Sequence, residues 1–569
     1  MSDEQIVAGP VIAVENSGFF KGLNKYVSII SIAIAGLFLL WVAVAKDVTL
    51  NPGTDDEKIV NQAAHILGKI QGGFNNNFGG WYLYVSAFYL IICLSLAVWP
   101  KAARIKLGGP DEKPEFSRFS WFSMMFGAGL GVGMLTYAVG EPIYHFMDNP
   151  DVIKGTAQGI SESNVRPAFK WTLLHYGLTA WGIYGLVGLG LAYFAYNRKM
   201  PLTIRSGLTP LFGKSLSGPL GHAVDITAII ATITGVGYTI ALGVKQFAFG
   251  LHNVTGADWI VPKGGSDPTN LAVLMCLAII AVASTLSAIS GVGKGIKWLS
   301  NINMGLSLFL LLFFAVFGIG SGALLFAFKH YFIAIWDYVI ALPSMSLTVY
   351  SDGASTVASD GTTECLDKMC ELTAWQGPWT ILYWAWWIAF APFVGLFLAR
   401  VSRGRSIREF VLGAMFAPAL MCLVWFALAG GSAIFAELNQ GADGAILNAN
   451  LSDMLFETIN TILSSGSIGA LLMSAIVVIL LITYLVTSAD SAILVITTIA
   501  SGGRSTRRLL KHIIFWGGLL ALVVGTLLVA GGLNALRAAM LIGALPFSVV
   551  VALMGISLVK DLIQRKPTQ

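Results

Sequence analysis

Residues 378–400 read PWTILYWAWWIAFAPFVGLFLAR, an apolar run whose one charged residue, Arg400, stands at its end. A helix needs about 20 such residues to cross the roughly 30 Å hydrocarbon core of a bilayer. The rest of the chain is similar, since 56% of its 569 residues are hydrophobic and 11% are charged, against about 25% charged in soluble domains. A mean hydropathy of +0.74 excludes an ordinary soluble protein. The sequence predicts one large helical membrane domain.

Twelve runs of this kind are long enough to span a membrane. They lie near residues 26–45, 81–99, 120–144, 171–196, 222–251, 271–292, 304–328, 378–400, 409–433, 468–500, 512–531 and 536–558. A shorter stretch, 331–345, contains Asp337 and is predicted to form an amphipathic helix at the interface. No loop is long enough for a soluble catalytic domain, so we do not expect an enzyme. The net charge of +5 gives no reason to expect a nucleic-acid partner.

The distribution of basic residues predicts the orientation of the spans. With the N-terminus inside, 24 of the 35 Lys and Arg residues fall in inner segments, including Arg403, Arg405, Arg507 and Arg508. Because cytoplasmic loops carry an excess of Lys and Arg, both termini are expected in the cytoplasm. The first 25 residues lack a continuous apolar core, so no cleaved signal peptide is expected.

The five cysteines are too few for a disulfide scaffold. Cys93, Cys276 and Cys422 stand in apolar runs, where packing is the expected role. Cys365 and Cys370 lie in a polar loop and could pair if that loop is external.

A glycine run, GAGLGVG at 127–133, lies inside the third predicted span. A dinucleotide site is excluded because it needs a βαβ unit in water. Two interpretations remain open. Small residues let neighbouring helices approach closely. Alternatively, the helix is broken at membrane depth, and its freed backbone lines a cavity for an ion and a substrate. Glu141, just after the run, is expected to cap or pair locally.

An aromatic face is predicted within the run 378–400. Four of its residues share an arc of about 120°: Trp386, Trp387, Phe390 and Phe393. Trp384 points nearly opposite and is expected to pack, while Pro392 and Gly395 are expected to interrupt the helix. An aromatic face at mid-membrane is either plain core or a binding box. In a binding box, the cation–π attraction between a desolvated quaternary ammonium group and each Trp ring would contribute on the order of 2 kcal/mol to binding.

The fourth span offers a partner for this face. In KWTLLHYGLTAWGIYGL, Tyr176, Trp181 and Tyr184 fall within an arc of roughly 140°. His175 stands beside them and is interpreted as a hydrogen-bonded packing residue rather than a proton carrier.

Hydroxyl groups in the tenth span are candidates for binding a small cation. Tyr484, Thr487 and Ser488 are spaced i, i+3 and i+4 and therefore share one face. The alternative is that the Thr and Ser hydroxyls bond back to carbonyls of their own helix. Asp490 is an intramembrane carboxylate, either functional or locally paired. Lys245, midway in the fifth span, is expected to pair or to lie at an edge.

Together these motifs resemble the betaine/choline/carnitine transporter family. The resemblance rests on WTILYWAWW at 379–387, FVGLFLARVSRGRSIREF at 393–410, GAGLGVG followed by Glu141-Pro142, the residues Trp181 and Tyr184, and TSADSA at 487–492. It covers roughly residues 20–560. Pro378 departs from the small polar residue usual before the Trp-rich string.

The resemblance implies a LeuT-like core of two inverted five-helix repeats preceded by two extra helices, within an all-α polytopic membrane protein of 12 transmembrane helices. The expected organisation is a cytoplasmic segment 1–25, two peripheral helices and an inner loop in 26–119, a first repeat in 120–330, the amphipathic helix 331–345, a second repeat in 378–558 and a cytoplasmic tail 559–569. A homotrimer in a bacterial inner membrane is also implied, with the amphipathic helix contributing to assembly.

The resemblance also implies the site residues. The substrate box would comprise Tyr176, Trp181, Tyr184 and Trp387, with Trp386 and Phe390 along the pathway. Tyr176 and Phe390 stand where Trp is frequent in the family. The sodium site would use carbonyls of Gly127, Leu130 and Tyr484 with the hydroxyls of Thr487 and Ser488. A second sodium site would retain Thr232 but meets Val236 at its other position, so it is expected to be weak, absent or rebuilt with Thr234.

The expected function is sodium-coupled import of a methylated zwitterion by alternating access, with no cofactor other than Na⁺ as the coupling ion. Choline is disfavoured because Gly129, Gly131 and Gly133 leave no acidic group in the glycine stretch. Glycine betaine, dimethylsulfoniopropionate and trimethylamine N-oxide remain candidates. The short C-terminal tail favours constitutive uptake over osmotic regulation. Proton-coupled uptake and carnitine-type exchange are the alternatives within transport, and a channel is the rival outside it.

Overall fold

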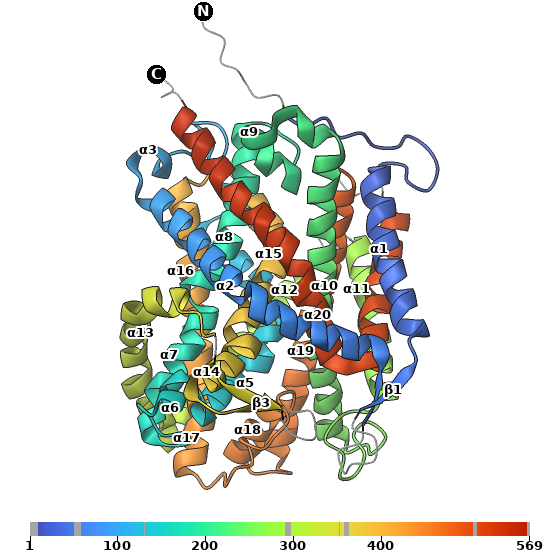
Figure 1. Ribbon diagram of the computed structural model, residues 1–569. Coiled ribbons are helices and arrows are strands. Elements are labelled where there is room, and N and C mark those ends of the chain that lie inside the picture. Colours follow the sequence, from blue (N-terminus) through green and yellow to red (C-terminus); the bar gives the residue numbers. More distant parts are fainter. Residues whose placement is uncertain are drawn as a thin grey trace, which may run out of the picture.

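The structure is a computed structural model that describes residues 9–50, 58–129, 131–290, 297–351, 353–357, 363–504 and 509–565. It is built almost entirely of helices that run between two opposite ends (Figure 1). The strands form two short antiparallel hairpins, β1 (Asp47–Leu50) with β2 (Lys58–Asn61) and β3 (Ser355–Val357) with β4 (Thr363–Cys365). The predicted all-α polytopic fold is confirmed.

The long helices are α1 (Lys25–Val44), α2 (Gln62–Val98), α4 (Arg118–Gly129), α5 (Val132–Met147), α7 (Val165–Tyr176), α8 (Leu178–Ala192), α10 (Pro219–Thr255), α11 (Asn270–Ser290), α12 (Lys297–Ser321), α13 (Ala323–Leu347), α15 (Leu382–Val401), α16 (Ile407–Trp425), α19 (Ile468–Ala500) and α20 (Leu510–Gln564). Shorter helices connect them: α3 (Pro100–Ala103), α6 (Pro150–Lys154), α9 (Thr209–Phe212), α14 (Lys368–Gln376), α17 (Gly431–Asn439) and α18 (Met454–Leu463).

Polar caps mark where several long helices begin and end. The side chains of Asn24 and Ser467 accept hydrogen bonds from Val27 N (3.0 Å) and Ala470 N (3.1 Å) at the starts of α1 and α19. α10 ends at Gly256, whose φ of +65° suits glycine. The ends of these helices therefore follow from local sequence.

Eleven helical stretches in the described residues are long and apolar enough to cross a membrane. They differ from the twelve predicted runs in three places. The third run is divided into α4 and α5, each too short to count. The last two runs, 512–531 and 536–558, are counted together as α20, although Gly532, with a non-helical φ of +61° and ψ of −152°, divides α20 into two helices as predicted. The stretch 331–345, which was expected to lie at the interface, belongs to the longer apolar helix α13.

The predicted boundary of the seventh span, 304–328, was misplaced. The helix α12 ends at Ser321, and the chain turns at Gly322, whose φ is +89°. The sequence stays apolar through the turn and into α13, so hydropathy alone does not detect the boundary between the two helices. α2 likewise begins well before residue 81, because its polar first half extends the helix beyond the apolar stretch.

The two ends of the bundle collect different loops. At the end where α1 begins and α20 ends in Figure 1, Asn24 N donates to Ala500 O, and Leu107 N donates to Arg405 O. Arg403 and Arg405, which were counted as inner, lie at this end. At the opposite end, Lys245 Nζ lies 2.7 Å from Asp267 Oδ1, which confirms that this lysine is paired. Cys365 and Cys370, also there, form a disulfide.

The core lies around α8, α10, α15 and α19. α15 packs against α8 and α10, and α10 packs against α19 and α20. In the most apolar 18 residues of the stretch Lys368–Val401, 94% are buried, against 28% in the corresponding part of α1. The aromatic run thus lies at the centre of the molecule, and α1, α12 and α13 lie outside it.

A buried ion pair anchors the start of α10. Arg205 Nε donates to Asp225 Oδ2 at 2.6 Å, and both side chains are fully buried. We expect Asp225→Asn to lower the free energy of unfolding by about 3–5 kcal/mol, because it leaves the Arg205 charge unpaired. Thermal unfolding in detergent measures this. Asp561→Asn, which breaks a more exposed pair with Arg198, is the matched control with a smaller expected loss; an equal loss in both variants would contradict the prediction.

Asp453, outside the spanning helices, gives the fold a pH dependence. Burial raises the pKa of this carboxyl from 3.8 to about 6, although a hydrogen bond from Asn253 opposes the shift. The folded state favours the protonated form, so the stabilisation is complete below about pH 4 and is lost as the pH rises through about 6. We expect Asp453→Asn to remove this component from the melting temperature measured against pH. An unchanged profile would contradict it.

Candidate substrate and ion site

The glycine run is the point where the third span breaks. Gly131 lies between α4 and α5 with non-helical φ and ψ of −130° and −132°. A Cβ at Gly131 would lie 3.1 Å from Ser488 Oγ, and one at Gly133 would lie 3.0 Å from a ring carbon of Trp386. The run therefore both interrupts the helix and allows α19 and α15 to approach.

The expected interruption at Pro392 and Gly395 is wrong, because α15 is continuous from Leu382 to Val401. A π-helical turn at Gly377–Ile381 lies before it instead. Packing against α8 and α10 holds the helix through the proline. At Gly395 a Cβ would lie 2.5 Å from Val187 Cγ1, so this glycine serves close packing with α8.

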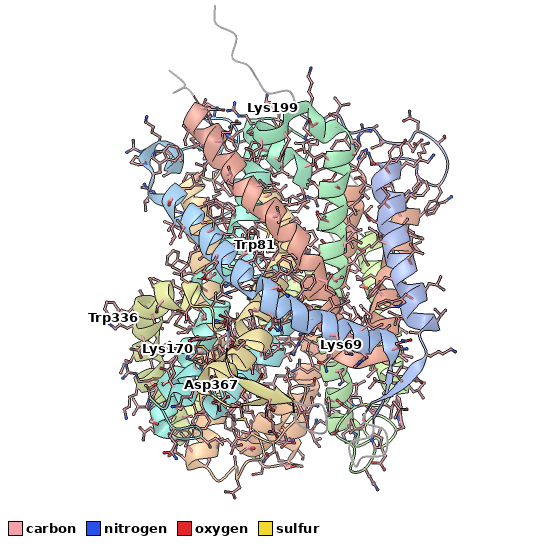
Figure 2. The ribbon with its side chains drawn as sticks, in the orientation of Figure 1. Lys69, Trp81, Lys170, Lys199, Trp336 and Asp367 are labelled. Atoms are coloured by element: carbon pink, nitrogen blue, oxygen red, sulfur yellow. A yellow bond between two sulfur atoms is a disulfide. The ribbon has the colours of Figure 1, made fainter. Side chains whose placement is uncertain are left out.

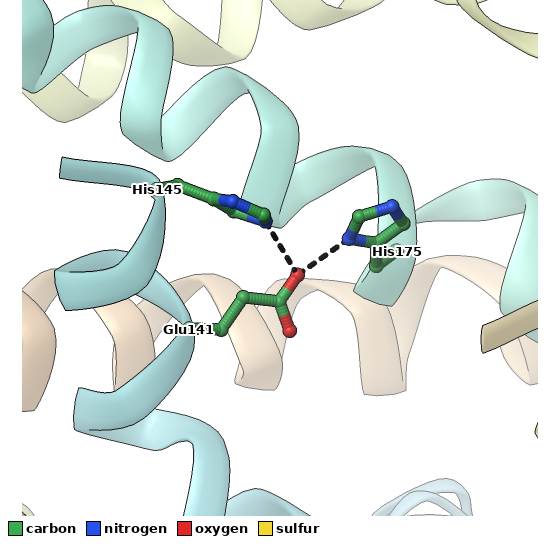
Figure 3. Close-up of side chains that lie close together, drawn as sticks. All are labelled: Glu141, His145 and His175. Carbon is green, nitrogen blue, oxygen red and sulfur yellow. Dashed lines mark hydrogen bonds and ion pairs between the residues drawn. The ribbon is translucent and has the colours of Figure 1, made fainter. Parts of the chain in front are cut away.

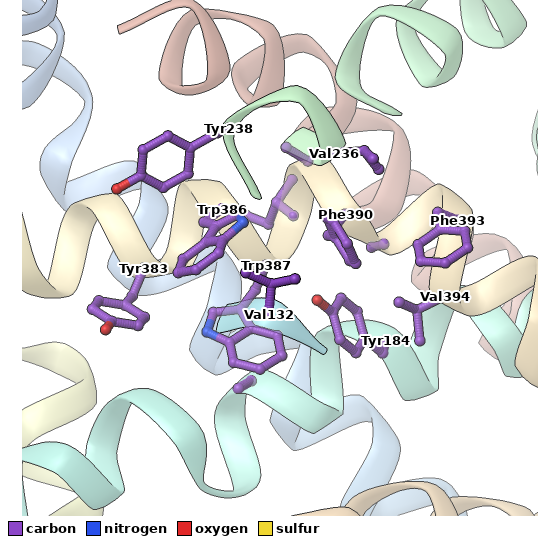
Figure 4. Packing of buried hydrophobic residues seen from close by; sticks show 14 of the residues in the cluster. Val132, Tyr184, Val236, Tyr238, Tyr383, Trp386, Trp387, Phe390, Phe393 and Val394 are labelled. Atoms are coloured by element: carbon purple, nitrogen blue, oxygen red, sulfur yellow. The ribbon is translucent and has the colours of Figure 1, made fainter. Parts of the chain in front are cut away.

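The aromatic side chains of α7, α8 and α15 meet around Trp387. Figure 4 shows Trp387 and Phe390 of α15 beside Tyr184 of α8. Its ring centroid lies 5.6 Å from Tyr176, 5.6 Å from Trp181 and 4.9 Å from Tyr184. Phe390, one turn further along α15, lies 6.5 Å from Tyr184. The structure thus brings together the aromatic residues of 176–184 and of 386–390, two segments about 200 residues apart that were expected to form one box.

A small cavity of about 40 Å³ opens beside these rings. It is lined by Gly131, Gly133, Met134, Tyr176, Tyr184, Thr239, Trp386, Trp387, Phe390 and Ser488. Five of the six expected substrate residues line it together with one expected sodium ligand. The volume holds roughly three water molecules. The rings must therefore separate to admit a larger organic molecule.

Two aromatic residues lie outside the cavity wall. Trp181 is fully buried behind Trp387, and its Nε1 donates to Tyr176 O at 3.0 Å across the bend between α7 and α8. It positions two walls of the box rather than facing the cavity. Trp384 contacts His175 on another side of α15, in keeping with a packing role.

The expected sodium ligands are only partly gathered. The Ser488 hydroxyl faces Gly131 across the helix break. Thr487 Oγ1 donates to Thr483 O and Tyr484 O, each at 3.0 Å, and accepts a bond from Asn303 Nδ2 at 3.2 Å. Gly127 stands near the end of α4, and Leu130 lies outside the described residues.

The hydroxyl groups considered for a second sodium site donate hydrogen bonds to carbonyls of their own helix, α10. Thr232 Oγ1 donates to Ala228 O at 2.7 Å, and Thr234 Oγ1 donates to Ile230 O at 3.0 Å. Neither residue lines the cavity. Asp490 accepts hydrogen bonds from Ser287 of α11 at 2.5 Å and from the adjacent Ser491 at 2.9 Å, and no ion pair of the described residues includes it.

Sequence reasoning missed Thr239 and Asn303. Thr239 accepts a hydrogen bond from Trp386 Nε1 at 3.0 Å and lines the cavity. No spacing pattern singles it out among the hydroxyls of α10. Asn303 contacts Thr487, and its polar side chain at the start of an apolar span was an available signal.

Comparison with known proteins decides the family. The sequence matches the BCCT, betaine/carnitine/choline transporter, family over residues 26–567. The chain belongs to this family. As a member it is a membrane transporter of quaternary ammonium compounds and not an enzyme.

Individual relatives agree with this assignment. The glycine betaine transporter OpuD of Bacillus subtilis is 35% identical over 94% of both chains. The osmo-dependent choline transporter BetT2 of Acinetobacter baylyi is 34% identical over 95% of this chain and 71% of its own. The high-affinity choline transport protein of Escherichia coli K12 is 38% identical over 66% of this chain and 50% of its own. A solved Na⁺-coupled sialic acid symporter, at 13% identity and a TM-score of 0.43 over 86% of this chain and 85% of that one, is too distant to carry an argument.

Proposed function

We propose that this transporter imports a methylated zwitterion of the glycine betaine, dimethylsulfoniopropionate or trimethylamine N-oxide type by sodium-coupled symport with alternating access. The observation that carries the proposal is the shared cavity. Aromatic rings that suit an ammonium group, the broken α4–α5 backbone and the Ser488 hydroxyl all line one space. An ion and a substrate bound there would lie close enough to influence each other.

The cavity supports a zwitterion rather than a simple cation. Among the described residues its lining contains no carboxylate, so a bare cation would find ring faces and hydroxyl groups but no counter-charge. The indole N–H of Trp387 is buried and has no acceptor among the described residues. It is therefore available to donate to a substrate carboxylate, while the rings of Tyr176 and Tyr184 hold the ammonium by cation–π attraction.

A homotrimer in a bacterial inner membrane, with both termini cytoplasmic, is part of the proposal. The surface that we assign to assembly is the outer face of α13, on which Leu325, Phe332, Trp336 and Ile340 are exposed. Trp336 projects away from the bundle in Figure 2. Cross-linking in native membranes tests the number of subunits, and a monomer there would contradict this part.

Uptake into proteoliposomes tests the function. Labelled glycine betaine is offered with an inward sodium gradient, or with potassium in its place. We expect saturable uptake that requires sodium. Uptake without sodium but driven by a pH gradient would identify proton coupling instead, and uptake that depends on internal substrate would identify exchange. Flux that does not saturate would identify a channel.

A further inference from the structure

Glu141 is a carboxylic acid buried at membrane depth on α5, with two histidines beside it (Figure 3). Its Oε1 lies 2.6 Å from His175 Nδ1 and 3.3 Å from His145 Nε2. Its Oε2 accepts a hydrogen bond from the Tyr383 hydroxyl. All three charged or chargeable side chains have zero exposure. Among the ion pairs of the described residues, neither Lys nor Arg joins this cluster.

The contacts place a proton between the carboxyl and an imidazole. A carboxyl oxygen 2.6 Å from an imidazole nitrogen requires a proton between them, whichever atom carries it. A neutral His175 already carries one such proton, so the cluster of ionised Glu141 and neutral His145 and His175 has a net charge of −1, and one further proton makes it neutral. Burial of a carboxylate without a counter-ion favours this neutral form, and loss of the further proton is sensitive to any nearby charge.

The cluster connects to the substrate cavity through two tyrosines. The Tyr383 hydroxyl, bound to Glu141, lies 3.5 Å from the Tyr176 hydroxyl. The Tyr383 ring also stacks on His175 at 4.7 Å. Tyr176 lines the cavity and contacts Trp387. A cation held by the box would thus lie two side chains from the carboxyl group.

Other titratable groups near the cluster are few. On α5 itself Tyr137 contacts Tyr383, and it lies within electrostatic range of Arg537 on α20. Cys422 on α16 lies within range of Tyr176. The charged groups of the elements packed against α5 have other partners: Arg166 pairs with Asp337, Lys170 with Asp151 and Lys245 with Asp267, while Asp453 is bonded by Asn253, Glu457 by Asn460, Asp490 by Ser287 and Glu437 by the backbone N–H groups of 444, 446 and 447.

We propose that Glu141, His145 and His175 form a proton-binding site that holds one further proton, which makes the cluster neutral, and releases it to bulk water when the substrate's ammonium group enters the aromatic box. This inference rests on the function proposed above for the box. A bound cation favours the negative form of the cluster. By linkage, loss of the proton strengthens substrate binding, so affinity rises with pH. One proton gives at most a tenfold change in affinity per pH unit.

The test uses the purified full chain in detergent, weakly buffered, with a pH-indicating dye and glycine betaine as the probe. We expect wild-type protein to release up to one proton per betaine bound and its dissociation constant to fall with pH between about pH 5 and 8, the range in which histidine charges change. Binding without proton release, or a dissociation constant that does not change over this range, would overturn the proposal.

Two variants identify the groups involved. Glu141→Gln removes the acid and His175→Gln removes the imidazole closest to it, so either one suffices if the other does not fold. We expect both to bind betaine without proton release and with a flat pH profile. If a folded Glu141→Gln or His175→Gln protein still releases a proton on binding betaine, the assignment of the proton to this cluster is overturned. Asp453→Asn, which removes a different buried carboxyl, is the control and keeps the wild-type slope.

Sodium-driven uptake by the same proteins separates this proposal from the function it rests on. Retained sodium dependence in Glu141→Gln or His175→Gln, together with a lost pH slope, supports a proton site distinct from the sodium site. A wild-type protein that binds betaine and releases a proton, but whose uptake ignores sodium, contradicts sodium coupling and leaves the proton site standing.

Discussion

Replacing Trp387 by alanine is expected to weaken substrate binding by about 30-fold or more. One desolvated cation–π contact contributes about 2 kcal/mol, and every 1.4 kcal/mol is tenfold in affinity. The ring also supports its neighbours, since Tyr176, Trp181 and Tyr184 all contact it. We therefore expect the dissociation constant of glycine betaine, measured by equilibrium binding at saturating sodium, to rise sharply.

A matched pair of milder variants separates binding from folding. Trp387→Phe and Trp384→Phe remove the same atoms from the same buried helix. Trp384 lies off the cavity, and its indole N–H, like that of Trp387, has no partner among the described residues. We expect similar melting temperatures but weaker binding only in Trp387→Phe. Full affinity in Trp387→Ala would remove the aromatic box from the mechanism.

Replacing Ser488 by alanine is expected to raise the sodium concentration for half-maximal uptake by at least about tenfold. Even groups that only support metal ligands contribute 10–100-fold to metal affinity, so a direct hydroxyl ligand should contribute no less. Ser488 faces the α4–α5 break and lines the cavity, whereas Thr487 is tied to its own helix and to Asn303. We expect a smaller effect from Thr487→Val.

The control for the sodium measurement lies one turn away on the same helix. Thr483 Oγ1 donates to Ile479 O at 2.9 Å and does not line the cavity. Thr483→Val keeps the side-chain shape and should leave the sodium dependence of uptake unchanged. Unaltered sodium dependence in Ser488→Ala would exclude this hydroxyl as a sodium ligand.

The sequence predicted those features that depend on helical periodicity. Trp386, Trp387 and Phe390 share a face because of the 3.6-residue repeat, and glycines at 127–133 indicated a break that the backbone at Gly131 has. The resemblance to the family placed this face in one substrate box with Tyr176 and Tyr184. No local sequence pattern predicts that these two segments lie in contact.

Features that depend on tertiary packing were not predictable from the sequence. α15 remains helical through Pro392 because its neighbours hold it. The approach of His175 to Glu141 depends on how α7 lies against α5. Periodicity within either segment contains no information about that distance.

The small cavity has a consequence for selectivity. Trp387 contacts three other rings, and each aromatic contact is worth about 0.5–1.5 kcal/mol. A molecule that enters must offset this free energy before any of its own attraction appears as affinity. A quaternary ammonium group attracts aromatic rings by cation–π interaction, so we expect it to separate these rings more readily than water does.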